Sequence, residues 1–227
     1  MVNEIKHAYL KEHPLFLLTS EETIQKACAT TRIKSYFKGE ILHNGETGNT
    51  RFYFLIKGKV KICELREDHN ELIKELLNSP DIFGDTGLSG YSGDAEYAEV
   101  LTNNTLICSM PINDMRELLE NDSRLAISYV NLVNKKLKKL EGRHSDLVFK
   151  DAKSRLIHFI KNWASEDGKP EGDSIIISNY LTHTDIANAI STSRQSVNVI
   201  LNELRELGML YYTREKIELR NSLFNAY

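Results

Sequence analysis

The 227-residue sequence contains no apolar run close to the ~20 residues that a membrane-spanning helix needs. Residues 1–18 place Glu4 and Glu12 among apolar side chains, so they lack the uninterrupted apolar segment of a secretory signal. The three cysteines lie far apart without a CxxC pair, and a small, odd number of thiols suits a reducing compartment. We therefore expect a cytoplasmic protein with no membrane partner.

The sequence also lacks an excess of basic residues. Its formal net charge is −3, with 29 Lys and Arg against 32 Asp and Glu, and the two kinds are equal in number from residue 150 onward. Net charge alone therefore does not indicate a nucleic-acid partner. Any contact with DNA must depend on where the charges lie rather than on their sum.

Catalytic and metal-binding motifs are absent as well. No GxSxG, GxxxxGK[ST] or HExxH sequence occurs, and no pair of acids lies in a recognisable cleft motif. An iron–sulfur cluster needs about four cysteine ligands, and none of the seven histidines has the HxH or HxxxH spacing of a metal site. We predict no enzyme activity, no metal and no cofactor, although a haem bound through one histidine stays open.

The amino-terminal part changes from helical to strand periodicity. Residues 3–30 favour one or two short helices, the second capped by Ser20. Apolar and polar residues then alternate, which predicts strands over residues 31–37 (with Ile33, Ser35 and Phe37 on one face), 53–56, 60–65 and 98–110. Short strands separated by turns predict an antiparallel sandwich or roll.

A heptad pattern follows the strands. Residues spaced alternately four and three apart form one stripe, which consists of Ala126, Val130, Val133, Leu137, Leu140, His144 and Leu147. A stripe this narrow favours pairing with a second helix over packing on the β domain, so we predict a homodimer seam. His144 either fixes the register of that seam, or responds to pH, or lies where the helix frays near Gly142. We favour fraying.

The carboxy-terminal residues have the pattern of two short helices joined by a tight turn. An apolar helical face over residues 156–163 ends in a breaker-rich loop at 166–172, and a short buried strand follows at 175–177. Thr184 and Ser193 are the expected caps of the next two helices. This spacing predicts a helix-turn-helix.

The second of these helices should present a polar amino-terminus away from its core. Arg can bond to guanine, Gln or Asn to adenine, and Ser at a helix start suits a phosphate. Residues 209–219 predict a two-stranded wing with a charged tip. The predicted DNA-binding residues are Thr184, Ser193, Arg194, Gln195, Ser196, Asn198, Arg214 and Lys216. The alternative is a ligand- or protein-binding module whose winged helix serves assembly rather than DNA binding.

Residues 53–60, 82–88 and 181–210 resemble three segments of the cyclic-AMP receptor protein/FNR (Crp/Fnr) family of transcription regulators. They are similar to its strand-glycine-strand sequence, its effector cassette and its helix-turn-helix, where Ser193-Arg194-Gln195-Ser196-Val197 matches the recognition helix. The resemblance covers nearly the whole chain. It implies an α+β fold whose three parts are an N-terminal antiparallel β-roll (a cyclic-nucleotide-binding-like jelly roll) in residues 1–122, a long dimerisation helix in 123–149 and a C-terminal winged helix-turn-helix in 150–227.

The same resemblance implies a sequence-specific, effector-modulated transcription regulator. As a homodimer it would bind a palindromic double-stranded DNA operator, with half-sites ~34 Å apart, and RNA polymerase would be a further partner. This chain departs from many members at three positions. Gln195 replaces a Glu and Val199 replaces an Arg, from which we expect a half-site richer in A·T pairs. Ser191 replaces the usual turn glycine, at modest cost.

The resemblance also places an effector pocket, with Phe83, Gly84, Asp85, Thr86, Glu96 and Tyr97 as its predicted residues. In members that bind cyclic AMP, an Arg of this cassette pairs with the cyclic phosphate and a Glu holds the ribose hydroxyl. Here Asp85 stands at the Glu position. The Arg position falls on Ala95 or Glu96, depending on how the loop 89–94 is aligned.

The charge around this cassette opposes a phosphate. No Lys or Arg occurs between Glu75 and Met115, whereas acidic residues recur there. A buried phosphate needs a positive or hydrogen-bonding partner to offset its lost hydration, and Glu96 would repel it. We therefore expect a small-molecule effector of unknown identity that is not a cyclic nucleotide.

Overall fold

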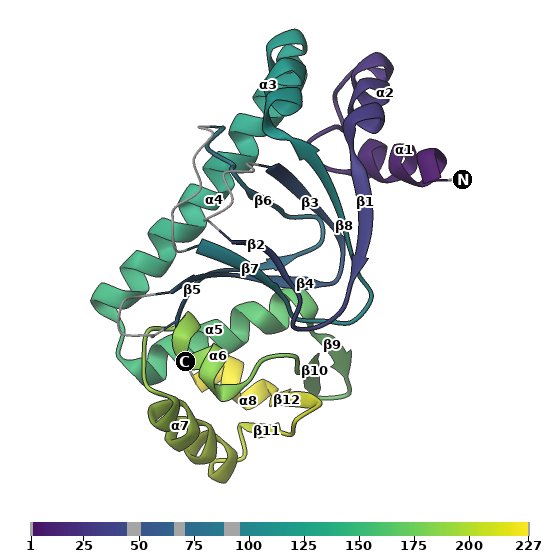
Figure 1. The fold of residues 1–227 in the computed structure, drawn as a ribbon. Coiled ribbons are helices and arrows are strands. Elements are labelled where there is room, and N and C mark those ends of the chain that lie inside the picture. The colour runs from purple at the N-terminus through teal and green to yellow at the C-terminus, as the bar shows by residue number, and fades with distance from the viewer. Residues whose placement is uncertain (1, 45–50, 66–70, 89–95, 227) are drawn as a thin grey trace. The chain divides into compact units, whose positions relative to one another are not determined.

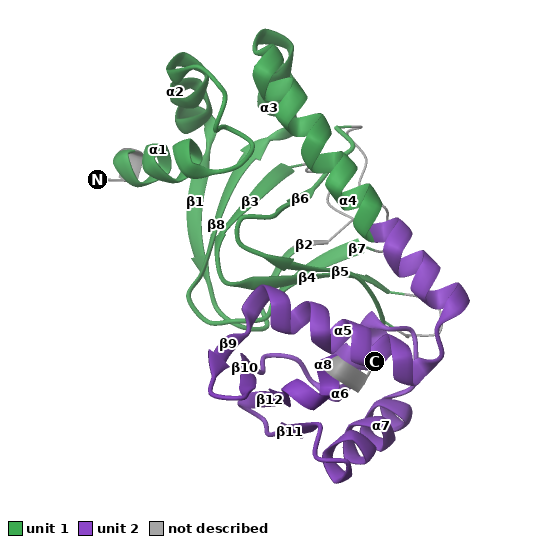
Figure 2. Cartoon of the chain, turned by 180° about the vertical axis from the view of Figure 1, so that it is seen from behind, with its two compact units in different colours: residues 1–139 green, residues 140–227 purple. Residues whose placement is uncertain are grey.

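The computed structural model describes residues 2–44, 51–65, 71–88 and 96–226. The chain divides into two compact units, residues 1–139 and 140–227 (Figure 2). The division falls within the long helix α4 (Ser123–Phe149). The separate dimerisation segment proposed for residues 123–149 stays a prediction. No helix of the described residues is both long and apolar enough to cross a membrane.

Two short helices begin the chain, α1 (Val2–Glu12) and α2 (Glu21–Thr30). Ser20 caps α2 as predicted, because its side chain accepts a hydrogen bond from the backbone N–H of Thr23 at 3.1 Å. His13 lies between the helices and is 1% exposed. Its Nε2 donates to the Pro80 carbonyl at 2.8 Å and its Nδ1 accepts from the Leu15 N–H at 3.2 Å. Burial lowers the pKa of His13 to about 4, which keeps the ring neutral.

The rest of the first unit contains two four-stranded antiparallel sheets, which form the predicted roll (Figure 1). The first sheet has the order β1 (Arg32–Tyr36), β8 (Thr105–Pro111), β3 (Arg51–Lys57) and β6 (Ile82–Gly84). The second has the order β2 (Ile41–Asn44), β7 (Glu96–Val100), β4 (Lys59–Leu65) and β5 (Glu71–Asn78). The turn from β3 to β4 requires Gly58, which has φ +100° and where an added Cβ would lie 2.2 Å from Thr105 Oγ1.

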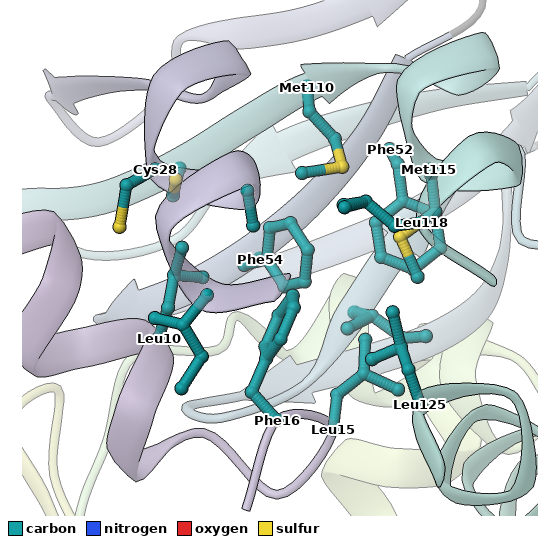
Figure 3. Packing of buried hydrophobic residues seen from close by; sticks show 14 of the residues in the cluster. Leu10, Leu15, Phe16, Cys28, Phe52, Phe54, Met110, Met115, Leu118 and Leu125 are labelled. Carbon is teal, nitrogen blue, oxygen red and sulfur yellow. The ribbon is translucent and has the colours of Figure 1, made fainter. Parts of the chain in front are cut away.

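The first sheet has a separate core on each face, because successive side chains of a strand point to opposite sides. Phe52 and Phe54 of β3 point toward α1, α2, α3 (Ile112–Asn121) and the start of α4 (Figure 3). Tyr53 and Leu55 point to the other face, toward the second sheet. The first core also contains Leu10, Phe16, Ile24, Met110, Met115 and Leu125, and the second contains Val60, Ile62, Phe83, Ala98 and Ile107.

Two strand predictions were wrong in detail. Phe37 was expected to continue the strand on the same face as Ile33, but β1 ends at Tyr36 and Phe37 is 63% exposed. The run predicted over residues 98–110 is two strands, because the chain turns between β7 and β8, where Asn104 has φ +56°.

Asp122 joins the helices of the first unit. Its Oδ1 accepts hydrogen bonds from the N–H groups of Arg124 and Leu125 and so caps α4, while its Oδ2 accepts from Ser20 N at 3.2 Å and Thr23 Oγ1 at 2.7 Å. Burial raises the pKa of Asp122, but these hydrogen bonds outweigh burial and lower it overall. From this cap α4 continues through Gly142 to Phe149, so the expected fraying near Gly142 was wrong.

The second unit contains the predicted winged helix-turn-helix. Its elements are α5 (Ala152–Asp167), β9 (Lys169–Glu171), β10 (Ser174–Ser178), α6 (His183–Ala189), α7 (Arg194–Glu206), β11 (Leu210–Tyr212), β12 (Lys216–Arg220) and α8 (Asn221–Ala226). The sheet has the order β11-β12-β10-β9. The loop predicted for residues 166–172 is shorter than expected, because α5 continues to Asp167 and β9 pairs with β10.

Candidate nucleic-acid interface and effector site

Helix α6 begins with a capping box at Thr182, not with a cap at Thr184 as predicted. Thr182 Oγ1 accepts from the N–H of Asp185 at 3.0 Å, and Asp185 Oδ2 accepts from the N–H of Thr182 at 2.9 Å. The prediction was therefore wrong by two residues. Thr184 is exposed on the first turn of the helix.

The turn after α6 is held by two arginines. Ser191 has φ +54°, the left-handed conformation expected where the family has glycine. Arg155 of α5 donates to the carbonyls of Ile190 (3.0 Å) and Ser191 (3.2 Å), and Arg143 donates to that of Ala189 (3.0 Å). Positive charge is favourable at the carboxyl end of a helix, so these contacts stabilise the turn. Sequence reasoning missed both arginines, because their acceptors are backbone carbonyls and leave no residue pattern.

Helix α7 is capped by Ser193, as predicted. Its Oγ accepts from the N–H of Ser196 at 2.9 Å, and the two hydroxyl oxygens are 2.8 Å apart. Both serines therefore serve the cap. Arg194, Gln195 and Asn198 are exposed, and the buried face of the helix consists of Val197, Ile200, Leu201 and Leu204.

Arg194 is the first residue of α7, where the helix dipole disfavours positive charge. Burial lowers the pKa of His183 in the first turn of α6, and the charge of Arg194 lowers it further. Arg194 therefore places a positive charge at the start of α7. An anion bound there would meet helix N–H groups together with a guanidinium.

The wing forms between β11 and β12. Thr213 Oγ1 accepts from the N–H groups of Glu215 and Lys216 at 3.2 and 3.1 Å and fixes the tip. Arg214 and Lys216 are exposed there, and Lys216 Nζ lies 3.8 Å from a carboxylate oxygen of Glu218. The predicted charged tip is thus present, at the side chains that were expected.

The stripe on α4 is an open apolar surface. Ala126 is half-buried and His144 is exposed. The larger apolar members are exposed by 64% (Val130), 38% (Val133), 51% (Leu137), 61% (Leu140) and 48% (Leu147). A helix in water normally buries such a face against a partner.

The predicted effector residues lie in two different sheets. Phe83 and Gly84 end β6, where the Phe83 ring stacks on Tyr53 with centroids 4.8 Å apart. Asp85 is buried at 5% exposed, and the carbonyl of Thr86 accepts a hydrogen bond from the Tyr129 hydroxyl of α4. Ala95 and the loop 89–94 lie outside the described residues.

Glu96 and Tyr97 open β7 in the second sheet. They are adjacent in the strand, so they point to opposite faces. Glu96 lies on the face of core residue Ala98, whereas the Tyr97 hydroxyl donates to Glu71 at 2.6 Å on the other face. That both residues belong to one effector pocket stays a prediction.

Lysines from outside the stretch between residues 75 and 115 pair with two of its acids, Glu75 and Glu96. Lys74 Nζ lies 2.7 Å from Glu96 Oε2 and 3.5 Å from Glu64 Oε2. Lys136 of α4 lies 2.8 Å from Glu75 Oε2. The predicted repulsion by a bare Glu96 was therefore overstated, because its charge is paired across the sheet.

The comparisons with known proteins agree with this architecture. Residues 33–122 match the family model of a cyclic nucleotide-binding domain, and residues 154–222 match that of a Crp-like helix-turn-helix domain. The global nitrogen regulator of Synechocystis sp. is 31% identical over 172 residues, which are 75% of this chain and 76% of that protein. The CRP-like cAMP-activated global transcriptional regulator of Mycobacterium tuberculosis is 23% identical over 182 residues, 80% of each.

Solved structures share the fold. A CooA mutant from Carboxydothermus hydrogenoformans has a TM-score of 0.74 at 24% identity, over 97% of this chain and 96% of that one. The c-di-GMP responsive global regulator CLP of Xanthomonas campestris has a TM-score of 0.74 at 17% identity, over 89% of this chain and 100% of that one.

A β-roll, a long helix and a winged helix-turn-helix in this order define a class of DNA-binding transcription regulators. The chain belongs to the Crp/Fnr family of that class. Members of this family are transcription regulators, not enzymes.

Proposed function

We propose that this regulator binds a palindromic duplex operator as a homodimer, with α7 of each subunit in the major groove. The observation that carries the proposal is an exposed arginine, Arg194, at the first residue of α7, where the helix dipole disfavours a cation. A guanidinium there can bond guanine O6 and N7, and Gln195 can bond adenine. Arg214 and Lys216 at the wing tip supply phosphate contacts.

The partner of the open stripe on α4 is a second copy of the chain. The stripe, Ala126 to Leu147, keeps its four-and-three spacing over the whole helix, which suits a parallel helix of the same sequence. Such a pair would place two α7 helices on one duplex, as a palindromic operator requires. His144 would then lie in the seam as its one ionisable member.

The effector is a small molecule other than a cyclic nucleotide. Lys74 and Lys136 each already pair with a carboxylate, so a phosphate would have to break those ion pairs and displace Glu96 or Glu75. Asp85, which is one methylene shorter than the Glu of cyclic-AMP-binding members, is buried. The backbone carbonyl of the next residue, Thr86, already accepts a hydrogen bond from the Tyr129 hydroxyl. The family match to a cyclic nucleotide-binding domain concerns the fold of the roll. We further propose that the regulator works in the cytoplasm, contacts RNA polymerase and has no catalytic activity.

The DNA proposal is tested by the salt dependence of binding. Duplexes selected from a random library and scrambled duplexes of the same length are titrated with the full chain while fluorescence anisotropy is recorded from about 50 to 200 mM salt. We expect preference for the selected duplexes and a steep linear fall of log affinity with log salt, because phosphate contacts release counterions. Equal affinity for both duplexes, or binding without a salt slope, would favour the assembly module instead.

Two further measurements test the dimer and the effector. Light scattering should give twice the 26.0 kDa chain mass, and Leu137→Lys together with Leu140→Lys should give a monomer with weakened operator binding. Cyclic AMP should change neither the unfolding temperature nor the operator affinity. A monomer at working concentration would contradict the seam, and DNA binding stimulated by cyclic AMP would contradict the effector proposal.

A further inference from the structure

One row of α7 faces directly away from its buried side. Gln195, Val199 and Asn202 are spaced four and three apart, so they lie in line on the helix surface. The row lies opposite the buried face, which consists of Val197, Ile200, Leu201 and Leu204. It therefore lies on the outward face of α7, the face that a groove would receive.

The middle of this row is apolar. Val199 is 59% exposed, and within α7, which is described throughout, it is the one large apolar side chain that is exposed. Valine is also a weaker helix former than the polar residues common on helix surfaces. Packing within the chain thus does not account for a valine here.

The neighbours of Val199 in the row are polar and have different surroundings. Asn202 Oδ1 accepts a hydrogen bond from the Tyr212 hydroxyl at 3.2 Å, which ties this end of the row to strand β11 of the wing. Gln195 is exposed one turn before Val199. The row therefore presents an amide toward the helix start and an isopropyl group after it.

We propose that Val199 is a specificity-determining residue that packs against the C5-methyl group of a thymine. In the major groove only thymine presents a methyl group, which apolar side chains contact. Four residues of helix rise about 6 Å, and base pairs are stacked about 3.4 Å apart, so the thymine would lie one or two base pairs from the base bonded by Gln195. This inference rests on the proposed function, because it requires α7 in the major groove.

The test removes single methyl groups from DNA. In the selected operator, each thymine is replaced in turn by deoxyuridine at the same position of both half-sites, and binding is measured by anisotropy. One position should weaken wild-type binding by about fourfold per half-site, the effect of one methyl group no longer buried. At that position cytosine should also weaken binding, and 5-methylcytosine should recover part of the loss.

The variant Val199→Ala should discriminate far less between the thymine and deoxyuridine operators, because it lacks the two γ-methyl groups that would pack against the thymine methyl. Leu207→Ala is the matched control, since Leu207 is an exposed apolar residue (56%) directly after α7. It should keep the full sensitivity to deoxyuridine. Both variants should unfold at the wild-type temperature, which separates recognition from folding.

The possible failures are distinguishable. If the selected operator binds with a salt slope but Val199→Ala keeps the wild-type response at every thymine, the inference is overturned and the DNA-binding proposal stands. If selection yields no operator at all, the proposed function fails, and with it the placement of Val199 in a groove.

Discussion

Three lysines of the first unit and two arginines of the second use their positive charges in different ways. In the β-roll, the side chain of Lys61 is 7% exposed, and its Nζ lies 2.9 Å from Glu71 and 3.1 Å from Glu99. Lys74 and Lys136 also form ion pairs with carboxylates. In the winged helix, Arg194 and Arg214 are exposed at a helix start and a wing tip. The first arrangement joins strands and helices within the roll, and the second offers charge to a partner.

The comparison explains how a chain of net charge −3 suits a DNA-binding role. A carboxylate that is paired with a lysine adds little to the field that a distant phosphate feels, whereas an exposed guanidinium at a helix start acts at short range. The positions of the exposed positive charges, and not the net charge of the chain, therefore decide whether it can bind DNA.

The largest effect is expected from Lys61. Lys61→Ala leaves Glu71 and Glu99 as partly buried carboxylates without their common cation, at a cost of about 3 kcal/mol in the free energy of unfolding. Burial raises the pKa of Glu71, but hydrogen bonds from Tyr97 and Lys61 outweigh it and lower that pKa overall, so loss of Lys61 should raise it. Urea unfolding at neutral pH measures the change.

The control for Lys61 is Lys74→Ala. Lys74 also holds two carboxylates, but its side chain is 42% exposed, so its removal should cost less than about 1 kcal/mol. Equal losses for the two lysines would show that burial does not separate their roles.

The next effect concerns the open charge at α7. Arg194→Ala should weaken operator binding by about 1–3 kcal/mol and relax specificity at one base pair. The same change should leave the free energy of unfolding unaltered or slightly raised, because it removes a cation from a helix amino-terminus. Anisotropy titrations and urea unfolding of the same preparation give both numbers, and undiminished operator affinity would refute the assigned role.

A smaller effect on the free energy of unfolding is expected when the pH is lowered, because His13 is buried. His13 has its pKa lowered to about 4 by burial, below the ~6.5 of an unfolded histidine. The folded state therefore excludes a proton that the unfolded state binds, so His13 lowers stability as pH falls from ~6.5 toward 4. Protonation would also remove Nδ1 as the acceptor for Leu15 N–H.

Between pH 7 and pH 5 this histidine should account for a loss of about 1–2 kcal/mol. The measurement is urea unfolding of the wild type and of His13→Gln at both pH values. The free energy of unfolding of His13→Gln should fall by about 1–2 kcal/mol less than that of the wild type. His7→Gln is the matched control, because His7 lies at the surface against Glu21. An identical pH response of His13→Gln and the wild type would contradict the buried, neutral ring.

The sequence predicted the elements better than their contacts. Period-two alternation, the four-and-three stripe and the cap at Ser193 identify the roll, α4 and the helix-turn-helix, because each pattern is local. The ion pairs Lys74–Glu96 and Lys136–Glu75 join residues 22 and 61 positions apart, and no local pattern encodes them. The burial of Lys61 is equally invisible, since a lysine in an alternating strand reads as a solvent-facing residue.

Other differences between prediction and structure could have been avoided from the sequence itself. Adjacent strand residues point to opposite faces, which separates the side chain of Glu96 from that of Tyr97. The turn at Asn103-Asn104 breaks the run over residues 98–110, as two asparagines in succession indicate. Thr182 stands three residues before Asp185, the spacing of a capping box, whereas Thr184 has no acidic partner at that distance.

The smallest effect is expected at the start of α6, where it tests whether Thr182 or Thr184 is the capping residue. Thr182→Ala removes the acceptor for Asp185 N–H and one side of the capping box, and should lower the free energy of unfolding by about 1 kcal/mol. Thr184→Ala, two residues later on the exposed first turn, should change it by less than about 0.5 kcal/mol. Because α6 supports α7, Thr182→Ala should also weaken operator binding slightly without altering which base pairs are read. If Thr184→Ala lowered the free energy of unfolding more than Thr182→Ala, the capping residue of α6 would be Thr184, as the sequence pattern predicted, and the capping box at Thr182 would be wrong.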